Sequence, residues 1–278
     1  TQRNWRECSV QIGLDEASVV DLPGIHSLHH LEGGDLSALK YLLWGDQRPA
    51  VSLHEKAGPP APFAPPDVIV QVVDAANLQS HLELTLELSQ LGRPMVLAVN
   101  RMDEALKKGL YINVKALELL LGMRVVPTVA LMGQGIADLF RAAADAARDD
   151  SCPLPQAPSA HIANRLRPLD AELNRPGLHE AFRLPQAFVL TQFAGADGFI
   201  EDELNQHFRQ LLPMLRRLRD EAGAGLPRPL AEELHADRHH RAATLVEAAL
   251  RIGSPAHSQD WRYWLDELFL HPQWGLIG

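Results

Sequence analysis

Three short groups of small and polar residues each follow an apolar run of the sequence. The first, Asp21-Leu22-Pro23-Gly24, comes directly after Ser18-Val19-Val20. An aspartate at the end of a strand can hold Mg²⁺ through a water molecule, and a glycine lets its backbone N–H approach a terminal phosphate without a Cβ in the way. Asp and Gly are also common turn residues, so on its own this group favours an ordinary turn.

The second group, Asn100-Arg101-Met102-Asp103, closes another apolar run. A carboxylate at Asp103 can accept two parallel hydrogen bonds from the N1–H and the amino group of guanine, a pair that adenine does not offer. Asn100 would brace the loop and reach the base edge, while the stem of Arg101 or Met102 can cover the base face. The alternative is that Asp103 caps the helix that follows it.

The third group, Thr128-Val129-Ala130 with Leu131 after it, closes a third run, and its residues Val129, Ala130 and Leu131 would place a backbone N–H near the base carbonyl. Taken alone, it is equally well a piece of core strand. The order of the three groups is more informative, because the strand ends of an open α/β sheet converge on one crevice. Together they predict a guanine-nucleotide site that binds GTP or GDP with Mg²⁺.

Continuous apolar runs rich in β-branched residues must position these groups. Such runs are typical of strands buried on both faces of a parallel sheet, and they occupy residues 18–20, 68–73, 95–99 and 125–130. Helical periodicity lies between them at residues 78–91, 114–121 and 136–147. The alternation predicts a doubly wound α/β domain over residues 1–148, with a proline-rich insertion at about 47–65.

The second half of the chain has a different pattern. Residues 149–158 contain three prolines and predict a linker. Helical periodicity follows at residues 204–219, 242–252 and 261–270, and no comparable apolar strand run accompanies it. Residues 159–278 are therefore expected to form a small all-helical domain.

Composition excludes several classes of protein. The 278 residues are 46% hydrophobic and 22% charged, with a net charge of −9 and no long Lys/Arg run, which argues against a nucleic-acid partner. Cys8 and Cys152 make neither a disulfide framework nor a thiolate metal site, so a reducing compartment is expected. No apolar run reaches the roughly 18 residues of a membrane span. The histidines, such as His26, His29 and His30, are predicted to be solvated surface residues rather than metal ligands.

Longer runs of the sequence resemble one known family, the ferrous iron transport protein B (FeoB) family. The resemblance rests first on Val72-Val73-Asp74-Ala75-Ala76-Asn77-Leu78, because this run is not shared by small GTPases at large. Residues 21–28, 82–88, 91–94, 121–127 and 133–136 resemble other parts of that family's G domain. Residues 235–241 resemble the stretch before the last long helix of its helical domain, and residues 264–275 the segment leading into its first membrane helix.

The resemblance implies a P-loop-GTPase-like doubly wound sheet, N-terminally truncated in this chain, followed by a small all-α helical domain. It assigns Asp21 and Gly24 to the switch II motif and Asn100 and Asp103 to guanine recognition. Ala130 falls at the small-residue position of the last nucleotide motif.

Cofactors, partners and location follow from the same resemblance. It implies GTP or GDP with Mg²⁺ held through water by Asp21, and the Mg²⁺-binding threonine of switch I falls on Ser9, which keeps the hydroxyl. It also implies a position on the cytoplasmic face of the inner membrane, a helical domain that slows nucleotide release, and a partner in the protein's own transmembrane domain, which passes Fe²⁺. Whether the chain forms a homo-oligomer is left open.

One expected motif does not occur in these 278 residues. The phosphate-binding pattern Gly-x-x-x-x-Gly-Lys-Ser/Thr, which supplies a backbone cradle, a lysine and a Mg²⁺ hydroxyl, is absent from the sequence. We therefore expect a GTPase in the full-length parent and little activity from this chain alone. The alternative function is a non-catalytic module, nucleotide-responsive or structural, that regulates a membrane transporter.

Overall fold

The computed structural model describes residues 6–45 except 14, residues 65–178 except 155, 176 and 177, and residues 183–252. The expected helix at 261–270 and nearly all of the proline-rich insertion lie outside these ranges. The strands are β1 (Arg6–Ile12), β2 (Asp15–Asp21), β3 (Ile69–Asp74), β4 (Met95–Asn100), β5 (Leu110–Ile112), β6 (Arg124–Pro127) and β7 (Leu250–Ile252). The helices are α1 (Gly33–Trp44), α2 (Leu78–Ser89), α3 (Met102–Lys107), α4 (Val114–Leu121), α5 (Ile136–Arg148), α6 (Ala160–Leu173), α8 (Gln186–Ala194), α9 (Gly198–His207), α10 (Leu212–Gly223) and α11 (Leu230–Ala249), with 3₁₀ turns η1 (Ala75–Asn77) and η2 (Ala130–Met132).

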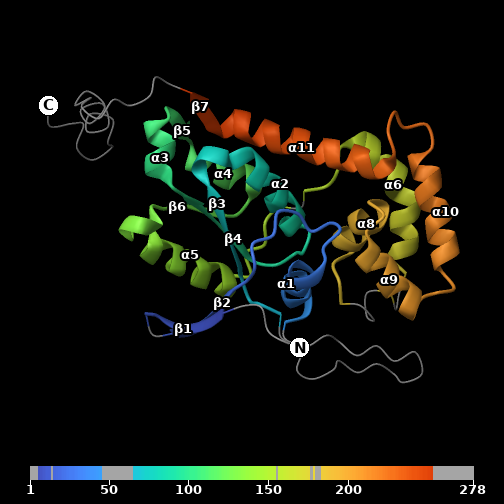
Figure 1. The fold of residues 1–278 in the computed structure, drawn as a ribbon, viewed down its shortest axis with the longest axis horizontal. Helices are drawn as coiled ribbons and strands as arrows, with labels where there is room; N and C mark the ends of the chain where they lie inside the picture. The colour runs from blue at the N-terminus through green and yellow to red at the C-terminus, as the bar shows by residue number, and fades with distance from the viewer. Residues whose placement is uncertain are drawn as a thin grey trace, which may run out of the picture.

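A parallel sheet with helices on both faces forms the first half, which confirms the predicted fold class. Its strands lie in the order β3-β4-β6. Their carboxyl ends lie at nearly the same level of the sheet, because Asp74 pairs with Asn100 and Val99 pairs with Pro127. One face, with Leu97 and Val125, packs on the core that includes α2 and α4. The other face packs on α5 (Figure 1).

Burial on both faces holds for β4 but not for β3. Val70 and Val72 are 39% and 63% exposed on one face of β3, while Gln71 and Val73 are buried on the other. The reason is that, among the described residues, α5 packs mainly against β4 and β6 and less against β3. A central strand between two neighbours is covered more completely than an edge strand.

The fourth expected strand lies elsewhere. The run at residues 18–20 does form a strand, β2, but it pairs antiparallel with β1 in a separate two-stranded ribbon instead of joining the parallel sheet. Val19 and Val20 are only partly buried. Two valines are too short an apolar run to require burial on both faces, so the expectation of a buried parallel strand here was wrong.

The helical group in the second half comprises α6, α8, α9 and α10 (Figure 1). The single helix expected at residues 204–219 is wrong, because α9 ends at His207 and α10 begins at Leu212. Pro213 explains the break, since proline is tolerated in the first turn of a helix and not in its interior. Asp197 fixes the start of α9 by accepting hydrogen bonds from the N–H groups of Phe199 and Ile200.

The last long helix returns the chain to the parallel sheet. The helix expected at residues 242–252 begins twelve residues earlier, as α11, and its last three residues form β7 instead. Figure 1 shows α11 running from the helical group back over α2 to the α/β half. There β7 pairs antiparallel with β5, and the Asn113 N–H donates to the Ala249 carbonyl at 2.7 Å. In the part of the chain that the structure describes, no helix combines the length and the apolar character that a bilayer crossing needs.

Candidate functional site

The loops that follow β4 and β6 are joined through one side chain. The Oδ1 atom of Asn100 accepts hydrogen bonds from the Ala130 N–H at 2.9 Å and from the Thr128 hydroxyl at 3.2 Å. The Thr128 N–H in turn donates to the Val99 carbonyl at 2.8 Å, and Thr128 is buried. Asn100 therefore braces the loop, as the sequence predicted, and the second and third groups of candidate residues are held together at the carboxyl end of the sheet.

The geometry of the loop after β6 depends on a glycine. Gly135 has a φ of +76°, and a Cβ there would collide with the carbonyl oxygen of Pro127. The loop closes on itself through two backbone hydrogen bonds between Val129 and Gln134, of 3.1 and 3.2 Å. This tight closure presents Leu131 at its tip, with 98% of the residue's surface exposed.

Arg101 does not extend over the surface in the way a base-covering side chain would. It adopts the left-handed conformation, with φ at +63°, and its Nη1 donates to the Asp74 carboxylate at 2.7 Å while Nη2 contacts Glu104. Asp74 ends β3 and accepts a further hydrogen bond from the Ala76 N–H. Arg101 thus ties the loop after β4 to the end of the neighbouring strand.

Asp103 is not a helix cap. Helix α3 begins at Met102, its N-cap position is Arg101, and no side chain makes a capping hydrogen bond there. Asp103 lies within the first turn, with its side chain 34% exposed and 3.7 Å from the Lys107 ammonium. The alternative interpretation of Asp103 as a cap was therefore wrong, while Met102 packs partly buried against the core.

The left-handed conformation at Arg101 predicts an order of stability among variants. Arg101→Ala and Arg101→Gly remove the same two ion pairs, but only glycine adopts a positive φ without strain. We expect Arg101→Gly to melt about 2–4 °C above Arg101→Ala, since left-handed backbone costs a residue with a Cβ roughly 1–2 kcal/mol. Thermal unfolding followed by circular dichroism measures this. Equal melting temperatures would show that the loop relaxes when its tether is lost.

The first group of candidate residues stands apart from the other two. Asp21 ends β2 and is exposed, with Leu22, Pro23 and Gly24 leading away from the ribbon. In the described part of the chain, the hydrogen bonds and ion pairs connect neither Asp21 nor Gly24 to the loops after β4 and β6.

The Mg²⁺ ligands implied by the resemblance do not fit one ion. Along the ribbon Arg6 lies opposite Asp21, whereas Ser9 lies opposite Ser18. Successive side chains of a strand point to opposite faces and rise about 3.4 Å each, so Ser9 and Asp21 lie on different faces and about 10 Å apart along the ribbon. No group of three or more metal-binding side chains occurs within the described residues either.

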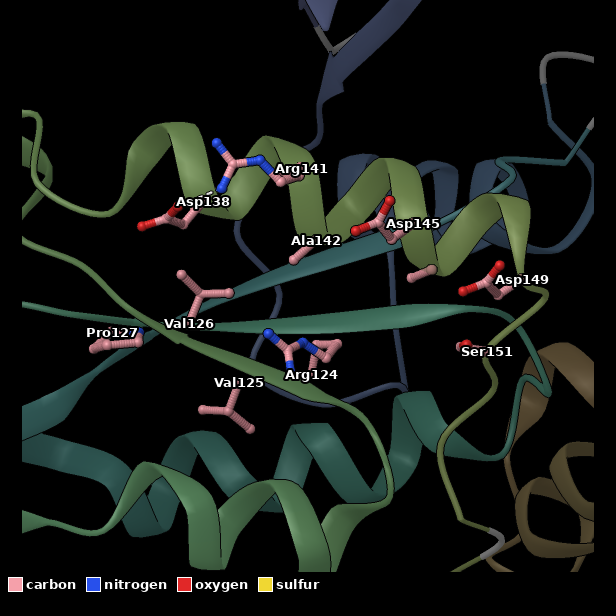
Figure 2. Close-up of a pocket in the computed structure, with 11 residues that line it drawn as sticks. Arg124, Val125, Val126, Pro127, Asp138, Arg141, Ala142, Asp145, Asp149 and Ser151 are labelled. Atoms are coloured by element: carbon pink, nitrogen blue, oxygen red, sulfur yellow. Dashed lines mark hydrogen bonds and ion pairs between the residues drawn. The ribbon is translucent and has the colours of Figure 1, made fainter. Parts of the chain in front are cut away.

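A separate hollow lies between β6 and α5, and none of the candidate residues lines it. It has a volume of about 500 Å³ and is bordered by Arg124 and by acidic residues of α5 and the turn after it, including Asp138, Asp145 and Asp149 (Figure 2). The edge of β6 is already partly occupied there, because Glu118 accepts a hydrogen bond from the Val125 N–H at 3.1 Å. The hollow runs along β6 and α5, whereas the candidate residues lie in the loops beyond the strand ends.

Comparison of the sequence with known proteins finds relatives for the part of the chain that contains these loops. Residues 63–143 match the family model described as ferrous iron transport protein B. A Porphyromonas gingivalis FeoA–FeoB fusion protein is 36% identical over 122 residues, which is 44% of this chain and 12% of that protein. Over this stretch the chain is similar to the FeoB proteins. The Salmonella typhimurium transporter FeoB is likewise 36% identical over 125 residues, and the match covers 44% of the chain and only 14% of FeoB.

Solved structures extend the likeness to nearly the whole fold. The cytosolic domain of L. pneumophila FeoB superposes with a TM-score of 0.67 at 23% identity, covering 89% of this chain and 85% of that one. An NFeoB structure from S. thermophilus bound to mGMPPNP gives 0.69 at 21% identity, covering 92% and 86%. The FeoB cytosolic fold, a P-loop-GTPase-like sheet followed by helices, is therefore the fold of this chain.

One buried charge escaped the sequence analysis, although the pattern carried a signal for it. Glu87 of α2 has only 2% of its side chain exposed. Leu84 and Leu91 lie three and four residues away, so Glu87 falls on the apolar stripe of the helix. A carboxylate on such a stripe needs a buried partner, and Arg238 of α11 supplies one at 2.9 Å. His29 beside it is also largely buried, so the expectation of a solvated residue was wrong there.

Proposed function

We propose that the chain binds guanine nucleotides, with the base at the loops after β4 and β6. The observation that carries the proposal is the pair of hydrogen bonds from Ala130 and Thr128 to Asn100, which fixes both loops before a ligand arrives. Loops that are already held in place by their own hydrogen bonds lose little conformational entropy when a ligand binds. FeoB structures described as GDP and GMPPNP forms share the fold and support the same ligand class.

Each residue of the site then has a distinct task. Asp103, which no cap hydrogen bond occupies, accepts from the N1–H and amino group of guanine. The N–H of Ala130 is taken by Asn100, which leaves the next amide, that of Leu131, for the base carbonyl. Leu131 itself, nearly fully exposed, gains an apolar surface to pack on when the base is bound. Arg101 holds the loop through Asp74.

The wider role rests on the relatives. We propose that the chain is the nucleotide-binding, cytoplasmic part of a ferrous iron transporter, acting at the inner membrane together with that protein's transmembrane domain. The chain spans only about an eighth of the length of the transporters it matches, 12% and 14%, so transport and GTP hydrolysis are proposed for the whole protein. Because Ser9 and Asp21 do not converge, no step is assigned to Mg²⁺ bound by these residues.

A nucleotide titration followed by NMR tests the base site. We expect GDP to shift the amide resonances of Asp103, Ala130 and Leu131 with a Kd in the millimolar range, about −4 kcal/mol, because these residues bind the base alone. ADP at the same concentration is the matched control, since it carries the same phosphates without the guanine edge. Equal shifts with both nucleotides, or shifts confined to other residues, would contradict the proposed site.

A further inference from the structure

Glu87 receives two hydrogen bonds and one ion pair, which come from two distant parts of the chain. Its carboxylate accepts hydrogen bonds from the backbone N–H of Leu28 and from the Ser27 hydroxyl at 3.0 Å, and it forms an ion pair with Arg238 Nη1 at 2.9 Å. Ser27 and Leu28 follow Gly24 by only a few residues, whereas Arg238 lies in the middle of α11. One buried side chain therefore connects the segment after the Asp21–Gly24 loop to the last long helix.

A second set of bonds ties the same segment to the helical group. Arg238, 11% exposed, also reaches the Nε2 atom of His29 at 3.0 Å. Burial, and next the charge of Arg238, lower the pKa of His29 to about 3, so the ring is neutral and Nε2 can accept this hydrogen bond. The next N–H, that of His30, donates to Asp197 at 2.7 Å, and Asp197 is the cap of α9.

Close packing reinforces these bonds. A Cβ on Gly195, at the end of α8, would lie 3.2 Å from the His29 ring, so the ring fills the space left by a glycine. Leu28 is 1% exposed and belongs to the main core. Residues 27–30 are thus held by α2, α9 and α11 at once, and this segment cannot move without breaking buried polar contacts, which are costly to leave unpaired.

The far end of α11 leads into a strand that pairs with the segment following α3. After Ala249 the chain enters β7, which pairs with β5, and β5 follows α3 and its Asp103 (Figure 1). The helix is therefore connected to the segments that follow two of the candidate groups: to residues 27–30, beyond Gly24, through Arg238, and to β5, beyond Asp103, through β7.

We propose that Glu87 and Arg238 form a buried joint that makes residues 27–30 and α11 move as one unit, so that a displacement of the Asp21–Gly24 loop is delivered to α11. Glu87 and Arg238 are positioning residues in this scheme and touch no ligand. The functional meaning of the joint rests on the proposed nucleotide site, but its existence does not, because the joint is complete in the chain without a ligand.

Hydrogen exchange of the ligand-free chain tests the joint from both sides. Arg238→Met removes the ion pair with Glu87 and the hydrogen bond to His29. We expect the amides of Leu28 and His30, which do not bond to Arg238, to exchange about tenfold faster than in the wild type. Glu87→Gln is expected to raise exchange in α11 around residue 238 by a similar factor, although it alters α2. Arg238→Lys keeps a charge beside Glu87 but lacks the planar guanidinium whose Nη1 lies between Glu87 and His29, so its effect should be intermediate.

A matched control lies one turn away on the same two helices. Glu83 of α2 pairs with His239 of α11 at 2.7 Å, but this pair is more exposed than Glu87 and Arg238, and among the described residues it makes no hydrogen bond or ion pair with residues 27–30. Glu83→Gln should leave the exchange of Leu28 and His30 unchanged. Should Arg238→Met unfold the chain, Arg238→Lys decides the matter. The proposed joint would be contradicted if Leu28 and His30 exchanged in Arg238→Met at the wild-type rate. If Arg238→Met does not fold, the same result in Arg238→Lys would contradict it. Failure of GDP binding alone would overturn the proposed function and leave the joint standing.

Discussion

Asp103→Asn is expected to lower GTP affinity at least about tenfold and to shift preference toward xanthosine triphosphate, in a version of the chain extended at its N-terminus by a phosphate-binding loop. The carboxylate pairs with the N1–H and the amino group of guanine, and each hydrogen bond to a charged group contributes roughly 1.5–3 kcal/mol. Xanthine carries a carbonyl where guanine has its amino group, so an amide can donate where a carboxylate repels. Titration of both nucleotides against both proteins measures the change.

Asp138→Asn is the matched control for this experiment. Asp138 also lies in the first turn of a helix, α5, and also has a basic partner, Arg141 at 2.9 Å, but it borders the hollow beside β6. Both substitutions remove one favourable charge from a helix N-terminus, which costs about 0.3–1 kcal/mol of unfolding free energy. Only Asp103→Asn should change nucleotide preference. Equal GTP affinity in the wild type and in Asp103→Asn would remove Asp103 from the base site.

The sequence predicted the parallel strands well because a strand buried on both faces is a continuous run of apolar residues. Residues 95–99 are all apolar, and β4 occupies them with one residue more. The helix at 114–121 was predicted to the residue, since Asn113 caps one end and Gly122, with φ at +65°, ends the other. Periodicity failed where a proline outweighed it, as at Pro213, which lies in the first turn of α10 inside a continuous apolar pattern.

The candidate site was predictable to the extent that it depends on strand ends. Asn100 and Ala130 come together because their strands are neighbours in a parallel sheet. The order of the three groups along the sequence predicted that such strand ends converge on one crevice. The conformation of Arg101 was not predictable, because its left-handed backbone is stabilised by Asp74, a partner 27 positions earlier in the chain. Ser9 and Asp21 are not brought together in the ribbon, and the sequence carried no sign of this. A hydroxyl at the right sequence position says nothing about which face of a ribbon it occupies.

Residues 1–278 alone are expected to hydrolyse GTP at least about a hundredfold more slowly than the version extended by a phosphate-binding loop. Loss of a single hydrogen-bond donor to the developing charge of a transition state costs about 10²–10³ in rate, and these residues contain no Gly-x-x-x-x-Gly-Lys-Ser/Thr pattern to supply such donors. Phosphate release under saturating GTP and Mg²⁺ measures both rates. An extended version with the loop lysine replaced by alanine controls for the added length.

The outcome separates the two functions that the sequence left open. Turnover by the extended version, lost on replacement of the lysine, supports a GTPase whose base site is the one described at β4 and β6. Guanine-specific binding without turnover in the extended version supports a nucleotide-responsive regulatory module, because the base site does not require hydrolysis. GTP turnover by residues 1–278 at the rate of the extended version would contradict the prediction, since catalysis would then depend on groups other than a phosphate-binding loop.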